Sequence, residues 1–566
     1  MSSRSVAMLA FMLALTAQAV ARDLPDFGLM VNNDGDLSFE SLDPQESAAK
    51  LRARVEALPG MGVKTVMYSV GAGSDILYYP TTVASVWGWR TTPQTEGKTW
   101  ADRIARNKAG MAAGVDPIRV VGQRTKELGL FFVPSYRMND SHFAVEPLEN
   151  PLTGEFWMKH HERLKLGASP VPGHPHYANL LDFSHAEVRE YRLGVLFEMI
   201  ERYQDIMDGV EMDFVRVQIL FPPGKAAAGA PLITEMVEKA RKRLDEVGAK
   251  NGRPYALFVR VPPTLRNCRW AGLDVEAWLK QRLVDVLIPS LLMTLAHDMP
   301  VDEFVALAQP AGCRVCPALL PRTSFQWPFS QTHDAAAYKG AAKREVTPEL
   351  VLGAACNYRR MGASGFQLFN FGLPPYEFIR PILASLSHPS SLAAATKVFA
   401  ITPAYWLDHE DSYEYRKQVP LDLATDKPKP PAGSEPARGW QKGASHAFKP
   451  HTITLFVGED LGGPGAPAPS FCALRLGFVG ATPETELALT VNGHVLHSGP
   501  LGEMLVSVRG TAPSNQRSYP PPATAYVQIP LTDLRVLRLG VNTLELTARR
   551  PPSQAPLRLV EAQLGV

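Results

Sequence analysis

The sequence lacks several features that would mark a specialised class of protein. It has only 5 cysteines among 566 residues, too few for a fold that depends on disulfide bonds. Its 58 lysines and arginines nearly balance 56 aspartates and glutamates, which leaves a net charge of +2. That balance gives no sign of a nucleic-acid partner or of an anionic membrane surface. We therefore expect a globular protein with ample apolar residues for a core.

Long apolar runs are also missing, except at the N-terminus. Arg4 precedes an apolar stretch at residues 6–15, and small residues follow at Ala17, Ala19 and Ala21. This pattern is typical of a secretory signal peptide over residues 1–21. An anchor that stays attached is the alternative, but the stretch is shorter than the ~20 residues that span a membrane. We expect a secreted or periplasmic protein without membrane contact once the signal is removed.

One cysteine pair, Cys313 and Cys316, has the C-x-x-C spacing of many metal and redox sites. The pair lies in an expected strand, where side chains three residues apart face opposite sides, and no second pair accompanies it. We expect both cysteines to be buried as small apolar side chains. The sequence predicts no metal ion and no cofactor.

Short apolar runs alternate with amphipathic helical stretches from about residue 25 to 385. Strands are expected at residues 27–33, 64–70, 129–136, 209–216, 255–261, 284–290, 313–320 and 365–371. Helix signals lie between most of them: Ser184 and Glu187 are spaced as a capping box, and Thr347 before Pro348 is typical of a helix start. This alternation predicts a (β/α)8 TIM barrel. A doubly wound sheet is the alternative, although no phosphate-binding glycine motif follows any strand.

The pattern changes toward the C-terminus. We assign residues 22–395 to the barrel and residues 396–445, which are rich in proline, glycine and charge, to a connecting segment and linker. Residues 446–566 show short alternating runs separated by turns such as Val491-Asn492-Gly493, without a helical period. They predict a C-terminal all-β sandwich domain.

Polar residues gather where the barrel strands are expected to end, which is where barrel enzymes place their active sites. The candidates for substrate binding are Asn32, Asn33, Asp34, Tyr68, Arg137, Asn139, His142, Arg216, Arg260, Gln367 and Asn370. Planar amides and guanidinium groups bind hydroxyl groups, and aromatic faces stack on sugar rings. This mixture favours a ligand with many hydroxyl groups.

The stretch DGVEMDFVRV, residues 208–217, carries two carboxylates in an otherwise apolar strand. Residues two apart on a strand face the same side, so Glu211 and Asp213 should both point into the barrel. Carboxylates that are buried so close together shift each other's pKa, which gives one proton holder and one ionised group. Glycoside hydrolysis needs such a pair. Alternatively, Glu211 forms an ion pair with Arg137 or Arg260 and only positions Asp213.

Asp140, in the stretch RMNDSH, is the third catalytic candidate. Partial burial and the nearby charge of Asp213 would raise the pKa of Asp140 toward the working pH. We therefore favour Asp140 as the proton donor, with Glu211 as the alternative and Asp213 as nucleophile or base. It is also possible to interpret Asn139-Asp140 as a turn that caps the next element.

These motifs together resemble a family of glycosyl-hydrolase-like (β/α)8 barrels, the family 10 glycosylhydrolase-like proteins. The resemblance spans most of residues 25–385 and is carried by RMND at 137–140, DGVEMDF at 208–214, GLDVEAWLKQRLVDVLIPS at 272–290 and GASGFQLFNF at 362–371. Asp213 falls on the terminal acid of that group's fourth strand, and it also matches the nucleophile position of the alpha-amylase superfamily. The expected fifth strand, ALFVRVPP, has no glutamate to serve as that superfamily's acid. The fourth strand is similar to the chitinase pattern as well, but Val215 stands where the chitinase acid should be.

The resemblance implies an enzyme that cleaves glycosidic bonds in a polysaccharide or oligosaccharide, so a carbohydrate is the expected partner. Two other classes of protein stay open. A barrel that binds carbohydrate without turnover is one, because the fifth and seventh strands lack acids. A metal-dependent esterase or deacetylase is the other, for which Asp140 and His142 offer a start. These residues do not specify an oligomeric state.

Overall fold

The computed structural model describes most of the chain: residues 22–35, 40–72, 75–90, 92, 98–171, 173–323, 325, 329–338, 345–371, 378–401, 418–419, 421–423, 450–464, 466, 469–508, 523–549 and 557–566. The expected signal peptide, residues 1–21, and most of the expected linker, residues 396–445, lie outside the described residues. Within the described ranges, no helix is long and apolar enough to cross a membrane.

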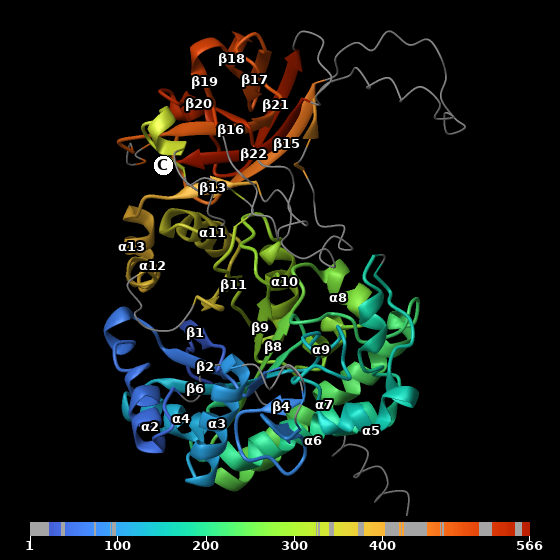
Figure 1. Ribbon diagram of the computed structural model, residues 1–566. Helices are drawn as coiled ribbons and strands as arrows, with labels where there is room; N and C mark the ends of the chain where they lie inside the picture. Colours follow the sequence, from blue (N-terminus) through green and yellow to red (C-terminus); the bar gives the residue numbers. More distant parts are fainter. Residues whose placement is uncertain are drawn as a thin grey trace, which may run out of the picture.

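A nine-stranded parallel sheet forms the centre of the larger part of the molecule (Figure 1). Its strands are β1 (Leu29–Asn33), β2 (Thr65–Ser69), β6 (Phe131–Arg137), β7 (Gly209–Asp213), β8 (Ala256–Val261), β9 (Val286–Pro289), β10 (Arg314–Val315), β11 (Ala318–Leu319) and β12 (Phe366–Leu368). The hydrogen-bonded order is β10-β9-β8-β7-β6-β2-β1-β12-β11. Each stretch that the sequence predicted as a barrel strand contains a strand of this sheet, and residues 313–320 supply both β10 and β11.

The two ends of this order are consecutive in the chain, because only Cys316 and Pro317 separate β10 from β11. Pro317 has no N–H to donate, so the ladder is interrupted there. On one side, the Cys316 N–H donates to the Leu287 carbonyl at 2.9 Å. On the other side, the Pro317 carbonyl accepts from the Gln367 N–H at 3.2 Å. One short stretch thus borders both ends of a curled sheet.

Helices connect most of the parallel strands. They are α2 (Pro44–Ala53), α3 (Lys98–Ala112), α4 (Pro117–Glu127), α5 (Glu155–Leu164), α6 (Ala186–Tyr203), α7 (Ala226–Asn251), α8 (Leu265–Ala271), α9 (Val275–Lys280), α10 (Val301–Ala308), α11 (Pro348–Arg360), α12 (Arg380–Leu386) and α13 (Pro389–Ala394). A small sheet of β3 (Gly71–Ala72), β4 (Ile76–Leu77) and β5 (Ser85–Val86) follows β2.

The sequence predicted one of two helix starts correctly. Thr347 is the N-cap of α11, and its side chain accepts from the Leu350 N–H. The capping box proposed for α6 is wrong, since the N-cap is His185 and makes no side-chain cap. The Ser184 N–H instead donates to the Asp182 carboxylate at 2.8 Å, which holds Ser184 in a turn before the helix.

The parallel strands are buried on both faces, as expected for a sheet that helices cover. On β7, Glu211 and Met212 point to opposite faces and both are fully buried. Directly after β7, Phe214 packs against Trp278 of α9 with ring centroids 6.1 Å apart. Cys313 and Cys316 are buried and unbridged, which confirms the prediction that they are core side chains.

The C-terminal part consists of antiparallel sheets, drawn in orange and red in Figure 1. One sheet has the order β13-β22-β16-β20-β19 with β14 beside β22, and the other has the order β15-β21-β17-β18. The strands are β13 (Val398–Ala400), β14 (Leu421–Asp422), β15 (His451–Val457), β16 (Ala473–Val479), β17 (Glu486–Val491), β18 (His494–Pro500), β19 (Leu505–Ser507), β20 (Ala525–Pro530), β21 (Gly540–Arg549) and β22 (Arg558–Gly565).

Apolar side chains of both antiparallel sheets share one core, for example Leu476 of β16 and Leu489 of β17. Sheet-on-sheet packing of this kind buries the inner face of each sheet. Asn492 and Gly493 form the tight turn between β17 and β18, with φ of 51° and 84°. Two central residues with positive φ are typical of the hairpin turn that the Asn-Gly dipeptide predicted.

The antiparallel sheets are anchored to α11. Gly353 of α11 allows the backbone of β13 to come close, because a Cβ there would lie 2.1 Å from the Val398 carbonyl oxygen. One turn later, Asn357 donates through Nδ2 to the Phe456 carbonyl at 3.2 Å, and its Oδ1 accepts from the Gly458 N–H at 2.8 Å. The same Nδ2 donates to the His297 carbonyl at 2.8 Å. Asn357 thus links the two parts of the molecule.

We predict that Asn357→Ala lowers the free energy of unfolding by about 3 kcal/mol, because it leaves several buried backbone groups without a partner. Urea titration followed by circular dichroism measures the change. The control is Asn251→Ala, whose side chain is exposed and bonds only to other side chains; it should cost about 0.5 kcal/mol or less. Equal losses in the two variants would contradict the anchoring role of Asn357.

Candidate active site

Three adjacent strands bring charged side chains into one row at the carboxyl end of the parallel sheet. Asp213 of β7 is in register with Arg137 of β6 on one side and with Arg260 of β8 on the other. Two residues earlier, Glu211 of β7 is in register with Ser135. Both carboxylates lie on the inner face of the sheet, as the two-residue spacing predicted.

Asp213 is held by Arg260 in a bidentate ion pair. Nε of Arg260 donates to Oδ1 at 3.0 Å and Nη2 donates to Oδ2 at 2.8 Å, while the Val215 N–H donates to Oδ1 at 2.8 Å. Arg260 also donates to Ser290 Oγ at 3.1 Å, and its guanidinium lies 3.7 Å from the ring centroid of Phe369. Asp213 and Arg260 are almost fully buried. This geometry suits a carboxylate anion at Asp213.

Glu211 lies deeper and is bound by neutral groups. Ser135 Oγ donates to Oε2, and Gln367 Nε2 donates to Oε1 at 3.0 Å. Gln367 belongs to β12, which is four places from β7 in the sheet order, so this bond crosses the interior of the curled sheet. Burial and then the charge of Asp213 raise the pKa of Glu211 to about 7. Near neutral pH, Glu211 can therefore hold a proton.

Asp140 differs from the sequence prediction. Burial would raise its pKa, but the charges of His142 and Arg216, a hydrogen bond from His142 and the charge of Arg137 together hold the pKa of Asp140 well below its usual range. Its carboxylate also accepts from the His142 N–H at 2.8 Å. The expectation that Asp140 keeps a proton near neutral pH is therefore wrong, because cations surround this carboxylate.

His142 and Arg216 complete this cluster at the rim. Arg216 Nη2 lies 2.9 Å from His142 Nε2, and Arg216 Nε lies 3.8 Å from Asp140 Oδ2. Arg137 pairs with Asp34 and lies 3.5 Å from Asp140. Both ring nitrogens of His142 have partners within this cluster. Within the described part of the chain, no group of three or more His, Cys, Asp or Glu side chains is placed to hold a metal.

The amides predicted at the strand ends fall into two groups. The side-chain oxygens of Asn32, Gln367 and Asn370 have no hydrogen-bond partner among the described residues, although Asn32 and Gln367 are buried. Asn33 and Asn139 form hydrogen bonds with backbone groups instead. Asn33 Oδ1 accepts from the Gly35 N–H at 3.0 Å, and Asn139 Nδ2 donates to the Ile219 carbonyl at 2.5 Å.

Tyr68 is not brought to the carboxylates. Its neighbour Met67 contacts Gln367 Nε2 through its sulfur, at 3.0 Å, inside the curled sheet. Because side chains alternate along a strand, Tyr68 faces the opposite side, where it is fully buried. Ser135, by contrast, was missed by sequence reasoning, although its position two residues before Arg137 places it on the same inner face.

Comparisons with known proteins do not assign this chain to a family. No protein-family model matches the chain, and no curated protein matches it. Similar solved structures include an alpha-L-fucosidase isoenzyme 1 from Paenibacillus thiaminolyticus, with 11% identity, 93% of this chain and 97% of that chain covered, and a TM-score of 0.33.

Two further similar structures cover less of this chain. A maltogenic alpha-amylase from Thermotoga neapolitana has 14% identity, 66% of this chain and 80% of that chain covered, and a TM-score of 0.34. A glycoside hydrolase family 18 N-acetylglucosaminidase from Paenibacillus barengoltzii has 11% identity, 63% of this chain and 99% of that chain covered, and a TM-score of 0.33. These values are too low to assign an activity or a substrate to this chain.

The raised pKa of Glu211 predicts a pH-dependent stability. The folded protein favours protonated Glu211, so this contribution to the free energy of unfolding is fully present below the ordinary pKa of 4.5 and is lost as the pH rises through about 7. Between pH 5 and pH 8, the free energy of unfolding should fall by about 3 kcal/mol more in the wild-type protein than in Glu211→Gln. Urea titrations at both pH values measure the difference.

The matched control for this comparison is Glu303→Gln, the same chemical change at an exposed position of α10. It should keep the wild-type dependence on pH. If Glu211→Gln follows the wild-type curve as well, Glu211 is ionised at neutral pH in the folded protein.

Proposed function

We propose that this protein is an exported glycoside hydrolase that cleaves a polysaccharide or its oligosaccharides. The observation that carries the proposal is the pair of carboxyl groups on β7. Glu211 has its pKa raised to about 7, while Asp213 is bound by an arginine in a geometry that suits the anion. Two carboxyl groups whose environments differ in this way provide the proton donor and the anionic group that glycoside hydrolysis requires.

The proposal treats the curled sheet as a (β/α)8 barrel. The stretch from Arg314 to Leu319 then counts as one strand that is interrupted at Pro317, which accounts for the pairing of β10 with β9 and of β11 with β12. In that fold the active site lies at the carboxyl ends of the strands. Asp213 is the last residue of β7 and meets this condition.

Each side chain then has a role in the reaction. Glu211 gives its proton to the glycosidic oxygen as the bond from that oxygen to the anomeric carbon breaks. Asp213 either attacks the anomeric carbon or removes a proton from the attacking water. Asp140 does not act as the acid, because its cationic surroundings keep it ionised; it holds Arg216 and His142 in place at the rim.

Carbohydrate binding is supported by the amide groups near the carboxylates. The side-chain oxygens of Asn32, Gln367 and Asn370 have no hydrogen-bond partner in the described structure. Hydroxyl groups of a sugar can donate to these oxygens, and burial of such acceptors without a partner is unfavourable. Arg137 and Arg216 supply donors at the same rim.

We predict that Asp213→Asn stays folded and loses at least about 10²-fold in turnover, as is typical when a group in the chemical step is removed. Release of reducing ends from a panel of glycans measures the rate. Asp302→Asn, the same change at an exposed position of α10, is the control and should keep the wild-type rate. A rate for Asp213→Asn above about a tenth of wild type removes Asp213 from the chemistry.

The choice of proton donor has its own test. Substrates with a good leaving group need little protonation, so Glu211→Gln should lose far less activity on an activated aryl glycoside than on the natural glycan. Asp140→Asn should lose a similar factor on both substrates, because its role is to position its neighbours. If instead Asp140→Asn shows the dependence on the leaving group, Asp140 is the acid.

A carbohydrate-binding barrel without turnover is the second candidate. The full pairing of Asp213 with Arg260 and the burial of Glu211 favour it, because a purely structural ion pair has the same geometry. Binding of a glycan without any release of reducing ends, unchanged by Asp213→Asn, would support this function over hydrolysis.

A further inference from the structure

Arg216 lies at the carboxyl end of the parallel sheet, three residues after Asp213. Its segment is bonded at two points to the segment that follows β6. The Met138 N–H donates to the Asp213 carbonyl at 2.9 Å, and Asn139 Nδ2 donates to the Ile219 carbonyl at 2.5 Å. Arg216 is therefore held between two backbone anchors, beside the carboxylate cluster.

The direction of the Arg216 guanidinium is set by His142. Nη2 of Arg216 lies 2.9 Å from His142 Nε2, and a guanidinium can only donate, so Nε2 must be an unprotonated acceptor. The proton of the neutral ring is then on Nδ1, which lies 2.5 Å from Oδ1 of the fully buried Asp140. The chain of Asp140, His142 and Arg216 thus holds one nitrogen of the guanidinium in place.

The other two nitrogens of Arg216 are open. Nε and Nη1 form no hydrogen bond to the described residues, and neither is fully covered by protein. The side chain as a whole is 19% exposed. The nearest carboxylate oxygen among the described residues, Oδ2 of Asp140, lies 3.8 Å from Nε, which is too far for a hydrogen bond. Arg216 therefore presents donors to a ligand at the rim.

The buried arginines around the parallel sheet are bound differently. Each has a carboxylate oxygen at hydrogen-bond distance, as a buried cation requires. The pairs in the described structure are Arg54 with Glu40, Arg137 with Asp34, Arg192 with Asp75, Arg241 with Asp285 and Arg260 with Asp213. Burial lowers the pKa of Arg216, and the charge of Asp140 does not fully offset this. Arg216 is thus a partly buried cation without an anion in contact with it.

We propose that Arg216 binds the carboxylate of a uronic acid in the substrate. The two coplanar oxygens of a carboxylate match two adjacent donors of a guanidinium, whereas the hydroxyl groups of a neutral sugar supply no charge. The proposal rests on the proposed action on carbohydrates and names the class of sugar, a glycan that contains uronic acids.

Arg137, the other arginine of the rim cluster, is less suited to a sugar acid. It pairs with Asp34, whose side chain is 31% exposed, so an anion placed there would also meet this carboxylate. Its Nη1 also lies 3.5 Å from Asp140. The geometry therefore favours a single acid group, bound at Arg216.

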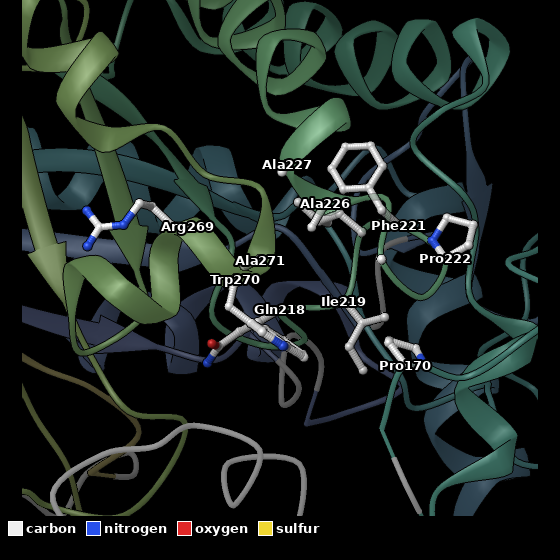
Figure 2. A pocket seen from close by; sticks show the side chains of 12 residues that line it. Pro170, Gln218, Ile219, Phe221, Pro222, Ala226, Ala227, Arg269, Trp270 and Ala271 are labelled. Atoms are coloured by element: carbon white, nitrogen blue, oxygen red, sulfur yellow. The ribbon is translucent and has the colours of Figure 1, made fainter.

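The cavity beside this segment does not offer a second place for the acid. It has a volume of about 260 Å³ and lies between the segment before α7 and the end of α8 (Figure 2). Its lining is mostly apolar, for example Phe221, and the amide atoms of Gln218 are covered by protein. Arg269 is the only charged residue among the described lining residues, and its guanidinium pairs with Glu276 at 2.8 Å. An anionic sugar group thus finds an open guanidinium at Arg216 and not in the cavity.

The test measures binding, not turnover. The probes are methyl thioglycosides of glucuronic and galacturonic acid, because the C–S bond resists hydrolysis. Their uronamides are the matched controls, since an amide keeps the shape of the acid and removes the charge. Ligand-observed NMR titration gives Kd. Wild type should bind one of the acids about tenfold more tightly than its amide, as is typical of hydrogen bonds to a charged group.

Arg216→Gln is the diagnostic variant. It should lose the tenfold preference for the acid and keep the wild-type Kd for the amide. Arg535→Gln, the same change at a side chain that is 82% exposed and pairs only with nearby Asp533, should match wild type. Thermal melting checks that both variants are folded. The comparison of acid and amide in wild type needs no variant, so it is decisive even if Arg216→Gln does not fold.

The proposal is overturned if acid and amide bind wild type equally, if neither binds, or if the preference survives in folded Arg216→Gln. A third probe, the 6-O-sulfated methyl thioglycoside of glucose, distinguishes the anions: tighter binding of the sulfate than of either acid contradicts a carboxylate site.

These outcomes are separate from the test of hydrolysis. A protein that releases reducing ends but shows no preference for the acid is a hydrolase without this subsite. A protein with the preference but without hydrolysis is a binding protein that has it.

Discussion

The inside of the parallel sheet is organised around the guanidinium of Arg260. A buried cation is costly unless an anion and further hydrogen bonds compensate it. Asp213 supplies the anion, Ser290 accepts another hydrogen bond, and the ring of Phe369 covers the guanidinium. These partners come from β7 and from the ends of β9 and β12, so one side chain connects three parts of the sheet. Because Arg260 forms its ion pair with Asp213, Glu211 has only neutral hydrogen-bond partners. This explains why the pKa of Glu211 is raised while Asp213 is paired with a cation.

The strands and much of their arrangement could be predicted from the sequence, because they depend on local patterns. Apolar runs of strand length separated by helical periods are repeated along the chain, and the structure places all of them in one sheet. The inward direction of Glu211 and Asp213 follows from their spacing alone. Two short signals were also sufficient, because all the residues that form each structure are neighbours in the chain. They are Thr347 with Pro348 at the start of α11, and Asn492 with Gly493 in the hairpin turn.

The electrostatic environment of the candidate active site could not be predicted from local sequence patterns. The pKa of Asp140 is lowered by His142, by Arg216, which lies on a different segment, and by Arg137, which pairs with Asp34 as well. The capping box predicted at Ser184 was wrong because the Asp182 carboxylate, which no helix pattern includes, accepts from the Ser184 N–H. The cavity beside Gln218 combines residues from the segment after β7 and from α8, and no spacing in the sequence marks it. In each case the decisive partner is distant in the chain or is one of several that fit equally well.

The interruption at Pro317 has a mechanical consequence. On this side of the curled sheet, β12 connects to β9 through the short stretch that holds β10 and β11, where the missing N–H leaves a gap in the ladder. α11 lies between β11 and β12 in the chain, and Asn357 fastens α11 to the antiparallel sheets. Phe369, which covers Arg260, follows β12 directly. A displacement of the C-terminal sheets would thus be passed by α11 to the strands on both sides of Pro317, and through Phe369 to the cation that holds Asp213.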